Sequence, residues 1–360
     1  MKSKNIAIVV KHLAEGGAQR SAAMLSLMLD KLGYKITFIA LYNKKEFTHK
    51  GNYVVLNSNK TSLRVLNKYH QFLSFRKVVK NNNFDFIIDF RGRTNFFREF
   101  IIYNFIYRNP KKIIFTVRES KLENYFPSPF FMFRSFYNKA FKIMAVSKFI
   151  ENKIKKKYSL QKVITINNGI DFSEIDNLKS KPILKTSEFI LAVGRFVKLK
   201  QFTELIEVYS KSKLIKKGIK LYIIGEGNLK DELNKVISLK KLQDLVKILP
   251  FQKNPYKYMS KAKFLVLPSK REGFPNVLIE ALACETPVIS FDCETGPRDI
   301  ICHGQNGLLV DNQNFDALKS AINSFAEDDN LYKICKQNAR ESVERFDLNS
   351  AMKLWHQLLS

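Results

Sequence analysis

Cysteine, glycine and proline are all scarce in this 360-residue sequence. With 14 Gly and 10 Pro, the chain cannot be a collagen-like or low-complexity protein, because both classes need far more of these residues. The 4 Cys are too few and too far apart for a disulfide framework or a zinc pattern. We therefore expect Cys284, Cys293, Cys302 and Cys335 to be free thiols.

Long apolar runs are missing as well. The richest apolar stretch, Phe96–Tyr107, is interrupted by Arg98 and Glu99. It therefore falls short of the ~18 uncharged residues that a membrane-spanning helix needs. The run Ile6–Val10 is shorter than the roughly 7–15 apolar residues of a signal peptide. We expect a cytoplasmic protein.

Acidic residues are too few to balance the basic ones. The chain has 33 Asp and Glu against 61 Lys and Arg, which gives a formal net charge of +28. Most of the excess lies in residues 1–180, which contain 33 Lys and Arg but 12 Asp and Glu. Such asymmetry favours an anionic partner: nucleic acid, anionic lipid or a phosphorylated substrate. A Lys-rich composition without functional meaning is the alternative.

Short β-branched runs alternate with longer amphipathic segments along the whole chain. The predicted strands are Ile6–Val10, Ile36–Leu41, Phe86–Phe90, Ile113–Val117, Ile143–Val146, Phe189–Val193, Lys220–Ile224, Val246–Leu249, Phe264–Leu267 and Val288–Ser290. The predicted helices are Arg20–Leu32, Leu63–Asn81, Phe130–Lys139, Lys200–Ser212, Leu229–Lys240, Asn276–Ala283, Phe315–Glu327 and Leu348–Ser360.

This alternation predicts parallel sheets with helical crossovers, and hence an α/β fold with two doubly wound domains. We assign the domains to residues 1–180 and 181–345, followed by a final amphipathic helix over 346–360. The polar segment Ile175–Ser187 is the expected join.

Ligands of open α/β sheets bind beyond the carboxyl ends of the strands. Gly16 and Gly17 follow the first predicted strand and precede a helix, whose N–H groups suit an anion. A tight turn without a ligand explains these glycines equally well. Gly225 and Glu226 follow another strand, where a purely structural turn is the stronger interpretation.

Basic residues follow the strand Phe189–Val193, in the order Gly194, Arg195 and, after Lys198, Lys200. An Arg can hold a phosphate through two N–H groups, and a Lys acts as a point charge. We expect Arg195 and Lys200 to face a ligand and Lys198 to face solvent.

The most informative segment is residues 268–297, PSKREGFPNVLIEALACETPVISFDCETGP. Glu272 precedes the turn Gly273-Phe274-Pro275, and Asn276 is expected to cap a helix that carries Glu280 about one turn inside. The N–H groups of Asn276 and Val277 lie between the two carboxylates in the sequence. A nucleotide sugar needs acceptors for its hydroxyls and donors for its phosphates, and this segment offers both.

The sequence resembles the retaining glycosyltransferases of family 4, which have the GT-B fold. The resemblance covers essentially the whole chain, through GGAQR, VGRFVKLK, IIGEG, EGFPNVLIEALACETPVIS, GPRDII and NGLLV. The string EGFPNVLIEALA is highly specific for the family. The stretch from Leu249 to Ala283 looks closest to bacterial UDP-sugar transferases, including N-acetylgalactosamine transferases of surface-glycan and glycoprotein-glycan assembly.

The resemblance implies two Rossmann-like domains and a C-terminal helix that returns to the first. It implies α-linked transfer of a hexose or N-acetylhexosamine from a UDP-sugar to a saccharide acceptor in polysaccharide, lipopolysaccharide or glycoprotein-glycan assembly. Arg195 and Lys200 would hold the diphosphate, and Glu272 the donor sugar, as catalytic residues. The implied donor-binding residues are Gly16, Gly17, Gly194, Gly225, Glu226, Phe251, Gln252, Gly273, Phe274, Pro275, Asn276, Val277 and, on the ribose, Glu280.

One loop departs from the family pattern. Many members carry a His after the strand that corresponds to Ile113–Val117, whereas this chain has Arg118 and Glu119. We assign no catalytic His, and we take these two residues as candidates to contact the donor sugar or the acceptor. The resemblance implies neither a metal nor another cofactor, because Arg195, Lys200 and a helix N-terminus supply positive charge and no Asp-x-Asp site is evident.

Three other functions stay open. A nucleic-acid-binding protein would explain the positive charge, but no nucleic-acid-binding motif is present. An epimerase of the same fold, acting on UDP-N-acetylglucosamine, would need no acceptor. A non-catalytic scaffold is disfavoured because Arg195, Lys200, Glu272 and Glu280 are all intact.

Basic and aromatic residues are interleaved over residues 62–148. They are Arg64, Lys68, Arg76, Lys77, Lys80, Arg91, Arg93, Arg98, Arg108, Lys111 and Lys112, with Phe96, Phe97, Tyr103, Phe126, Phe130, Phe131 and Phe133. This composition suits an anionic bilayer surface. We expect the protein to bind the inner face of the cytoplasmic membrane and to use a polyprenyl-diphosphate-linked acceptor. The alternative is that the aromatic residues fill the core.

Overall fold

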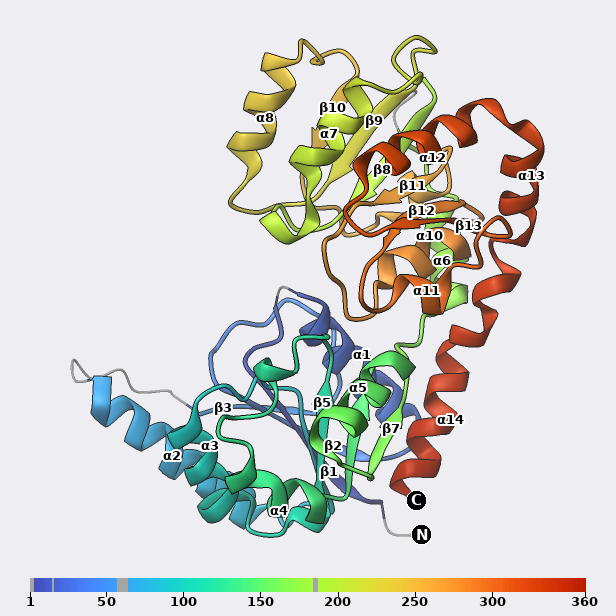
Figure 1. The fold of residues 1–360 in the computed structure, drawn as a ribbon. Coiled ribbons are helices and arrows are strands. Elements are labelled where there is room, and N and C mark those ends of the chain that lie inside the picture. Colours follow the sequence, from blue (N-terminus) through green and yellow to red (C-terminus); the bar gives the residue numbers. More distant parts are fainter. Residues whose placement is uncertain (1–2, 15, 57–63, 184–186) are drawn as a thin grey trace. The chain divides into compact units, whose positions relative to one another are not determined.

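The computed structural model describes residues 3–14, 16–56, 64–183 and 187–360. The chain forms two compact units, residues 1–168 with 351–360, and residues 169–350. Each unit contains one parallel sheet flanked by helices (Figure 1). The predicted α/β fold with two doubly wound domains is therefore confirmed.

The first unit has a seven-stranded sheet in the order β3-β2-β1-β4-β5-β6-β7, and all its pairings are parallel. The strands are β1 Asn5–Val10, β2 Lys35–Ala40, β3 Asn52–Val55, β4 Phe86–Asp89, β5 Ile113–Val117, β6 Lys142–Ala145 and β7 Val163–Thr165. Residues Ile6–Val10 are fully buried, as expected for a central strand covered by helices on both faces.

The helical segments of the first unit differ greatly in length. They are α1 Gly17–Lys31, α2 Arg64–Asn81, α3 Phe96–Ile101, the π-helix η1 Ile102–Tyr107, η2 Pro110–Lys112, η3 Leu122–Asn124, α4 Phe131–Lys139 and α5 Lys148–Tyr158. The helix α14 spans Leu348–Leu359, and its part from Ala351 onward also belongs to this unit. Lys4 Nζ donates to the carbonyl oxygens of Leu359 and Ser360, a favourable position for a cation at the end of α14. The predicted return of the C-terminal helix to the first unit is confirmed.

The second unit has a six-stranded parallel sheet in the order β10-β9-β8-β11-β12-β13. Its strands are β8 Phe189–Val193, β9 Lys220–Ile224, β10 Val246–Leu249, β11 Leu265–Leu267, β12 Val288–Asp292 and β13 Gly307–Asp311. Its helical segments are α6 Phe172–Lys179, η4 Lys198–Lys200, α7 Phe202–Ser210, α8 Lys230–Leu239, α9 Tyr256–Met259, α10 Asn276–Ala283, α11 Pro297–Ile300, α12 Phe315–Glu327, α13 Asp329–Asn338 and η5 Glu341–Phe346.

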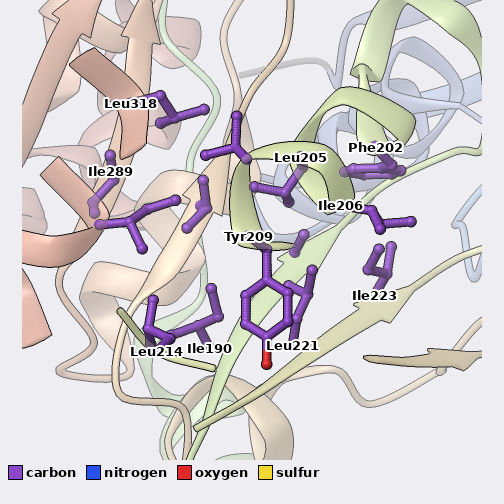
Figure 2. Close-up of a cluster of buried hydrophobic side chains, with 14 of the residues drawn as sticks. Ile190, Phe202, Leu205, Ile206, Tyr209, Leu214, Leu221, Ile223, Ile289 and Leu318 are labelled. Atoms are coloured by element: carbon purple, nitrogen blue, oxygen red, sulfur yellow. The ribbon is translucent and has the colours of Figure 1, made fainter. Parts of the chain in front are cut away.

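An apolar core joins α7 to the sheet of the second unit. Phe202, Leu205 and Ile206 of α7 face Leu221 and Ile223 of β9, as Figure 2 shows. The i, i+3, i+4 spacing of the buried α7 residues gives the helix one apolar face. This packing fixes the start of α7, and with it the short segment η4 that precedes the helix.

The sequence prediction did not identify the strands β3, β7 and β13 or the helices α3, α5, α6, α9, α11 and α13, of which α6 lies in the expected join. The other predicted strands and helices are present, with ends that differ by at most three residues. Leu63, the predicted start of α2, lies outside the described residues, as does Glu15 beside the first glycine pair. No helix in the described part of the chain is long and apolar enough to cross a membrane.

Candidate active site

Lys200 and Glu272 meet at the carboxyl edge of the second sheet. Lys200 Nζ lies 2.5 Å from Glu272 Oε1, and the side chains are 16% and 13% exposed. Lys200 ends η4, after β8, and Glu272 follows β11, the neighbouring strand in the sheet. Since adjacent parallel strands end at the same edge, two residues far apart in the sequence form one ion pair.

Backbone contacts hold the two loops that carry this pair. The Lys270 N–H donates to the Leu199 carbonyl at 3.0 Å, which joins the loop after β11 to η4. The Thr295 hydroxyl donates to the Glu272 carbonyl. Gly296 has a φ of +91°, and a Cβ at this position would lie 2.4 Å from Pro275 Cδ. The loop after β12 therefore packs directly against the turn that follows Glu272.

Close packing requires glycine at Gly225 and leaves little room at Gly194. A Cβ on Gly194 would lie 3.2 Å from Phe202 Cζ and 3.4 Å from Lys200 Cε, so these side chains would have to shift slightly. A Cβ on Gly225 would lie 1.9 Å from the Gly194 carbonyl oxygen. Gly225 thus lets the turn after β9 pack on the turn after β8. The Phe196 N–H donates to the carbonyl of the exposed Glu226 at 2.7 Å, which fixes the same contact.

The two other basic residues of this loop are both exposed. The side chains of Arg195 and Lys198 form no hydrogen bond or ion pair with any residue that the structure describes. Lys200, by contrast, is held by Glu272. The loop therefore offers one anchored ammonium and, at Arg195, an exposed guanidinium with all its N–H groups available to a ligand.

The turn and helix after Glu272 differ in one respect from the prediction. Pro275 is the N-cap of α10, without a side-chain capping bond, and Asn276 is the first helical residue. The predicted capping role of Asn276 is therefore wrong, because Pro275, with φ −79° and ψ 90°, already provides the extended residue before the helix. Glu280 lies one turn inside α10 and is 5% exposed.

The remaining predicted donor-site residues of this unit vary in exposure. Gly273, Phe274 and Pro275 are buried, and the Phe274 ring packs edge-on against Phe346 at 5.3 Å between centroids. Val277 is half-buried in the first turn of α10. Phe251 and Gln252 follow β10, and Phe251 is exposed. Their predicted roles toward a nucleotide remain predictions.

In the first unit, Gly16 and Gly17 begin α1. Gly16 has a φ of +87°, which favours glycine, and α1 has no side-chain N-cap bond. Arg118 follows β5 and is buried, whereas Glu119 is exposed and accepts a hydrogen bond from Asn124. Arg118 Nη2 donates to Asn168 Oδ1 at 2.5 Å. Sequence reasoning missed Asn168, although it follows the short β-branched run Val163–Thr165.

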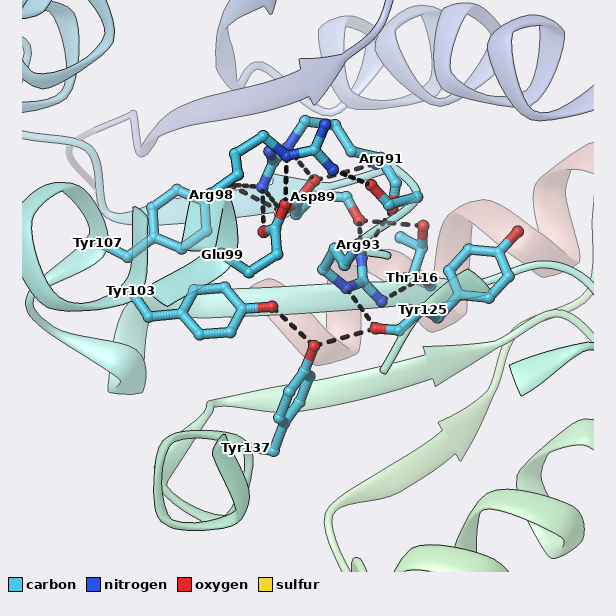
Figure 3. A network of polar contacts seen from close by, with 11 residues as sticks. Asp89, Arg91, Arg93, Arg98, Glu99, Tyr103, Tyr107, Thr116, Tyr125 and Tyr137 are labelled. Carbon is cyan, nitrogen blue, oxygen red and sulfur yellow. Dashed lines mark hydrogen bonds and ion pairs between the residues drawn. The ribbon is translucent and has the colours of Figure 1, made fainter. Parts of the chain in front are cut away.

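A buried ionic network lies at the end of β4 (Figure 3). Arg91 donates to both oxygens of Asp89, at 3.0 and 2.7 Å, and to Glu99 at 3.2 Å. Arg93 donates to the carbonyls of Tyr125 and Thr116, at 2.9 and 3.0 Å. The expectation that Arg91 and Arg93 face a membrane is therefore wrong. All their guanidinium nitrogens except Arg91 Nη1, which has no partner among the described residues, donate to acceptors inside the unit.

The ionisation of this network follows from burial and pairing. Burial disfavours the Asp89 carboxylate, but Arg91 and Arg93 outweigh it and lower the Asp89 pKa below its usual value. Burial also raises the pKa of Tyr137, which hydrogen-bonds to Tyr103 at 2.7 Å, to about 12. At neutral pH, Asp89 is therefore an ionised carboxylate and Tyr137 is a neutral phenol.

The aromatic residues expected on the surface divide into buried, exposed and half-buried groups. Tyr103, Phe126 and Phe133 belong to the core, so the surface prediction is wrong for these three. They pack against other rings: Tyr103 lies edge-on to Phe133 at 5.6 Å and stacked on Phe136 at 4.6 Å between centroids. Phe97 and Phe131 are 75% and 76% exposed. Phe96 and Phe130 are half-buried.

The four cysteines form no disulfide. Cys284, Cys293 and Cys335 are buried, and burial raises the pKa of Cys293 to about 12, with a further contribution from Glu272. Within the described ranges, no group of three or more His, Cys, Asp or Glu side chains is arranged to hold a metal ion.

Comparison with known proteins gives consistent matches over both units. Residues 15–174 match the family model described as "Glycosyltransferase Family 4", and residues 174–342 match "Glycosyl transferases group 1". A Campylobacter jejuni protein is 30% identical over 357 residues, with 96% of both chains covered. It is named N-acetylgalactosamine-N,N'-diacetylbacillosaminyl-diphospho-undecaprenol 4-alpha-N-acetylgalactosaminyltransferase.

Two solved structures have the same fold at low sequence identity. A glycosyltransferase from Rickettsia africae is 18% identical with a TM-score of 0.79, over 100% of this chain and 98% of that chain. A point mutant of Staphylococcus aureus TarM, in complex with fondaparinux, alpha-GlcNAc-glycerol and UDP, is 16% identical with a TM-score of 0.77, over 99% and 100% of the two chains.

Proposed function

This chain belongs to glycosyltransferase family 4 and has the GT-B fold, and we propose that it is a retaining transferase that uses a UDP-sugar. Glycosyl transfer to a lipid-linked saccharide is the activity in the name of its Campylobacter jejuni relative. The proposal adds an α-linked product, a hexose or N-acetylhexosamine as the transferred sugar, and N-acetylgalactosamine as first choice. The name of the Campylobacter jejuni relative supports the sugar and the α-linkage.

The observation that carries the proposal is the contact between Lys200 and Glu272. An ammonium has three N–H donors, and Glu272 takes one of them. The other two are available to a diphosphate, while the second oxygen of Glu272 is available to a sugar hydroxyl. The pair thus places N–H groups that can donate to a phosphate beside a carboxylate oxygen that can accept from a sugar hydroxyl. In a nucleotide sugar, the reactive bond joins the sugar to the phosphate.

Arg195 completes the positive charge in the proposed site. Glu272 neutralises Lys200, so a dianionic diphosphate would depend on the exposed Arg195 guanidinium for net attraction. The N-terminus of α10, which has no side-chain cap, favours negative charge near Asn276 and Val277. Glu280, one turn further along α10, is our candidate for the ribose hydroxyls.

The proposed reaction needs no nucleophile from the protein. The bond between the anomeric carbon and the diphosphate oxygen breaks, and the acceptor hydroxyl bonds to the same face of that carbon. The acceptor proton moves to an oxygen of the leaving diphosphate. The protein contributes orientation and electrostatic stabilisation of the departing UDP, so we propose that no divalent metal is needed.

We propose a saccharide linked to a polyprenyl diphosphate as the acceptor. The printed name of the Campylobacter jejuni relative contains a diphospho-undecaprenol acceptor, which supports this choice. Such a substrate lies in a membrane, and exposed apolar side chains occur on the neighbouring segments α2, α3, η1 and α4. They are Leu66, Tyr69, Leu73, Phe97, Phe100, Ile101, Phe105, Phe131 and Met132, and we call them the apolar surface.

Positive charge predominates on the segments that contain most of the apolar surface. Over residues 66–111, the exposed charged residues are the cations Lys68, Arg76, Lys77, Lys80, Arg98, Arg108 and Lys111 and the anion Asp85. Each cation near an anionic bilayer contributes roughly 1 kcal/mol of binding. We therefore propose peripheral binding to the inner face of the cytoplasmic membrane.

A donor panel tests the proposed activity. The protein is incubated with UDP-N-acetylgalactosamine, UDP-N-acetylglucosamine, UDP-galactose and UDP-glucose, each with and without undecaprenyl-diphosphate-linked saccharide, in the presence of EDTA. We expect transfer to the lipid-linked saccharide from one of these donors. Loss of activity with EDTA and its rescue by Mn²⁺ would contradict the proposed metal independence. A new UDP-sugar formed without acceptor would indicate an epimerase.

Vesicle co-sedimentation tests the membrane partner. Binding should require anionic lipid and weaken with salt, because the Debye length falls from about 10 Å at 0.1 M to about 3 Å at 1 M. The double change Phe97→Ser and Phe131→Ser should reduce binding, whereas Leu239→Ser, at an exposed position of the second unit, should not. Equal binding to neutral and anionic vesicles would refute this part of the proposal.

A further inference from the structure

The carboxyl edge of the first sheet contains a buried cation without a carboxylate partner. Arg118 is 9% exposed, and its guanidinium carbon lies 5.3 Å from the centre of the Phe90 ring. No Asp or Glu among the described residues forms an ion pair with it. Arg91, which is also buried in the same unit, is paired with both Asp89 and Glu99.

A buried charge without a counter-ion lowers the stability of the folded protein, so the presence of Arg118 here requires an explanation. Burial lowers the pKa of Arg118 to about 10, although Tyr125 acts in the opposite direction. A buried pair that loses one partner is strongly destabilised, because the remaining charge stays in a poorly solvated place. A counter-ion that arrives with a ligand would remove this cost when the ligand binds.

Asn168 connects this cation to the start of α1. Its Oδ1 accepts the hydrogen bond from Arg118, and it also lies 3.2 Å from the Ser21 hydroxyl. The Ser21 oxygen is 2.9 Å from the Gly17 carbonyl, in the first turn of α1. Arg118 is therefore held beside the N-terminus of a 15-residue helix.

The described residues leave the N-terminus of α1 uncapped. The helix has no side-chain N-cap bond, and no described atom outside the neighbouring residues lies within 4 Å of the position that a Cβ on Gly17 would occupy. Helix N-termini favour anions, and so does a guanidinium that has no carboxylate counter-ion. Two independent features of one edge thus favour negative charge at the same place.

We propose that Arg118 binds a phosphoryl oxygen of a substrate and that Asn168 is the positioning residue that holds its guanidinium beside the start of α1. The inference rests on the proposed function, which supplies two phosphoryl sources, the UDP-sugar and the lipid diphosphate of the acceptor. An Asn suits the position because its amide oxygen orients the guanidinium without neutralising it. An Asp would orient it equally well and cancel its charge.

The decisive variant is therefore Asn168→Asp. It keeps the shape and the oxygen that accepts from Arg118 and Ser21, and it adds the missing carboxylate. If Arg118 has a structural role alone, this change strengthens its contact and leaves ligand binding unaltered. If Arg118 binds phosphate, affinity should fall by about tenfold or more, as expected for a charge introduced within ~4–6 Å of an ionised group.

The measurement is calorimetric titration of the full chain with inorganic pyrophosphate, UDP and undecaprenyl diphosphate in micelles. Asn138→Asp, at an exposed position of α4, adds the same charge to the same unit and is the matched control. Weaker UDP binding in Asn168→Asp assigns the site to the donor, and weaker undecaprenyl diphosphate binding assigns it to the acceptor. Weaker pyrophosphate binding supports the site even if the wild-type protein transfers no sugar.

Two results would overturn the inference. One is unchanged affinity of Asn168→Asp for all three probes while its thermal stability equals or exceeds that of the wild type. The other is an equal loss in Asn168→Asp and Asn138→Asp, which would indicate a general effect of charge. Arg118→Met serves as a second variant, and it should lose the same phosphate affinity because it removes the cation and keeps an unbranched apolar chain in its place.

Discussion

Arg93 and Arg98 lie five residues apart, yet their replacement should have opposite consequences. The Arg93 side chain is buried and donates to the carbonyls of Tyr125, Arg91 and Thr116 at 2.9–3.0 Å. The Arg98 side chain is 44% exposed and pairs with Glu99. Arg93→Ala should therefore destabilise the first unit, whereas Arg98→Ala should chiefly weaken membrane binding.

The magnitude follows from the contacts of Arg93. Hydrogen bonds to a charged group contribute about 1.5–3 kcal/mol each, and Arg93→Ala removes three of them together with part of the counter-charge of Asp89. Breaking a buried ionic contact costs about 3–5 kcal/mol. Arg98→Ala should cost less, because Arg98 is partly exposed and the buried Glu99 stays paired with Arg91. We expect a loss of at least about 3 kcal/mol for Arg93→Ala and a clearly smaller loss for Arg98→Ala.

The single Trp provides the assay. Trp355 is buried in the part of α14 that belongs to the first unit, so its fluorescence reports the unfolding of that unit. With a urea dependence of about 1–3 kcal/mol per M, a loss of about 3 kcal/mol lowers the midpoint by roughly 1–3 M. An unchanged midpoint for Arg93→Ala, combined with weaker vesicle binding, would refute the buried placement of Arg93.

Three further predictions concern the site, the thiols and pH. Lys200→Ala should reduce turnover by about 100-fold, as for other groups that stabilise charge in a transition state, whereas Lys198→Ala should change turnover little. Similar rates for the two variants would contradict the proposed contact between Lys200 and the diphosphate. At about pH 8, near the ordinary thiol pKa, the exposed Cys302 should react with Ellman's reagent well before the buried thiols, and four equal rates would contradict their burial. Because pairing lowers the Asp89 pKa, its contribution to stability is complete above the unfolded value and is lost as pH falls through the folded one. The urea midpoint of the wild type should therefore decrease below about pH 5, and Asp89→Asn should lower it at about pH 7 and reduce this pH dependence.

The sequence predicted best those strands that are buried on both sides. Phe189–Val193 is a continuous apolar run and Ile113–Val117 is interrupted by Thr116 alone, and the observed bounds of both strands equal the predicted ones. The missed strand β3, Asn52–Val55, is half-buried at the sheet edge, and β7, Val163–Thr165, has three residues. Short or edge strands carry a weak pattern because few of their side chains must be apolar.

Residue types at the candidate site were predictable, but their contacts were not. Lys200 and Glu272 were both expected near a ligand, yet their ion pair depends on the adjacency of β8 and β11 in the sheet. Arg91 and Arg93 were misassigned because a composition of basic and aromatic residues does not reveal which side chains point inward. Their burial is possible only because Asp89, Glu99 and several carbonyls meet them in three dimensions.

The central claim about this protein is that it transfers a sugar from a UDP-sugar with retention of the anomeric configuration. The direct measurement is the anomeric configuration of the product, determined by proton NMR after incubation of the protein with UDP-N-acetylgalactosamine, or the active donor of the panel, and undecaprenyl-diphosphate-linked saccharide in EDTA. We predict an α-linked product in the wild type and a strongly reduced yield of the same product in Glu272→Gln. A β-linked product would contradict the central claim.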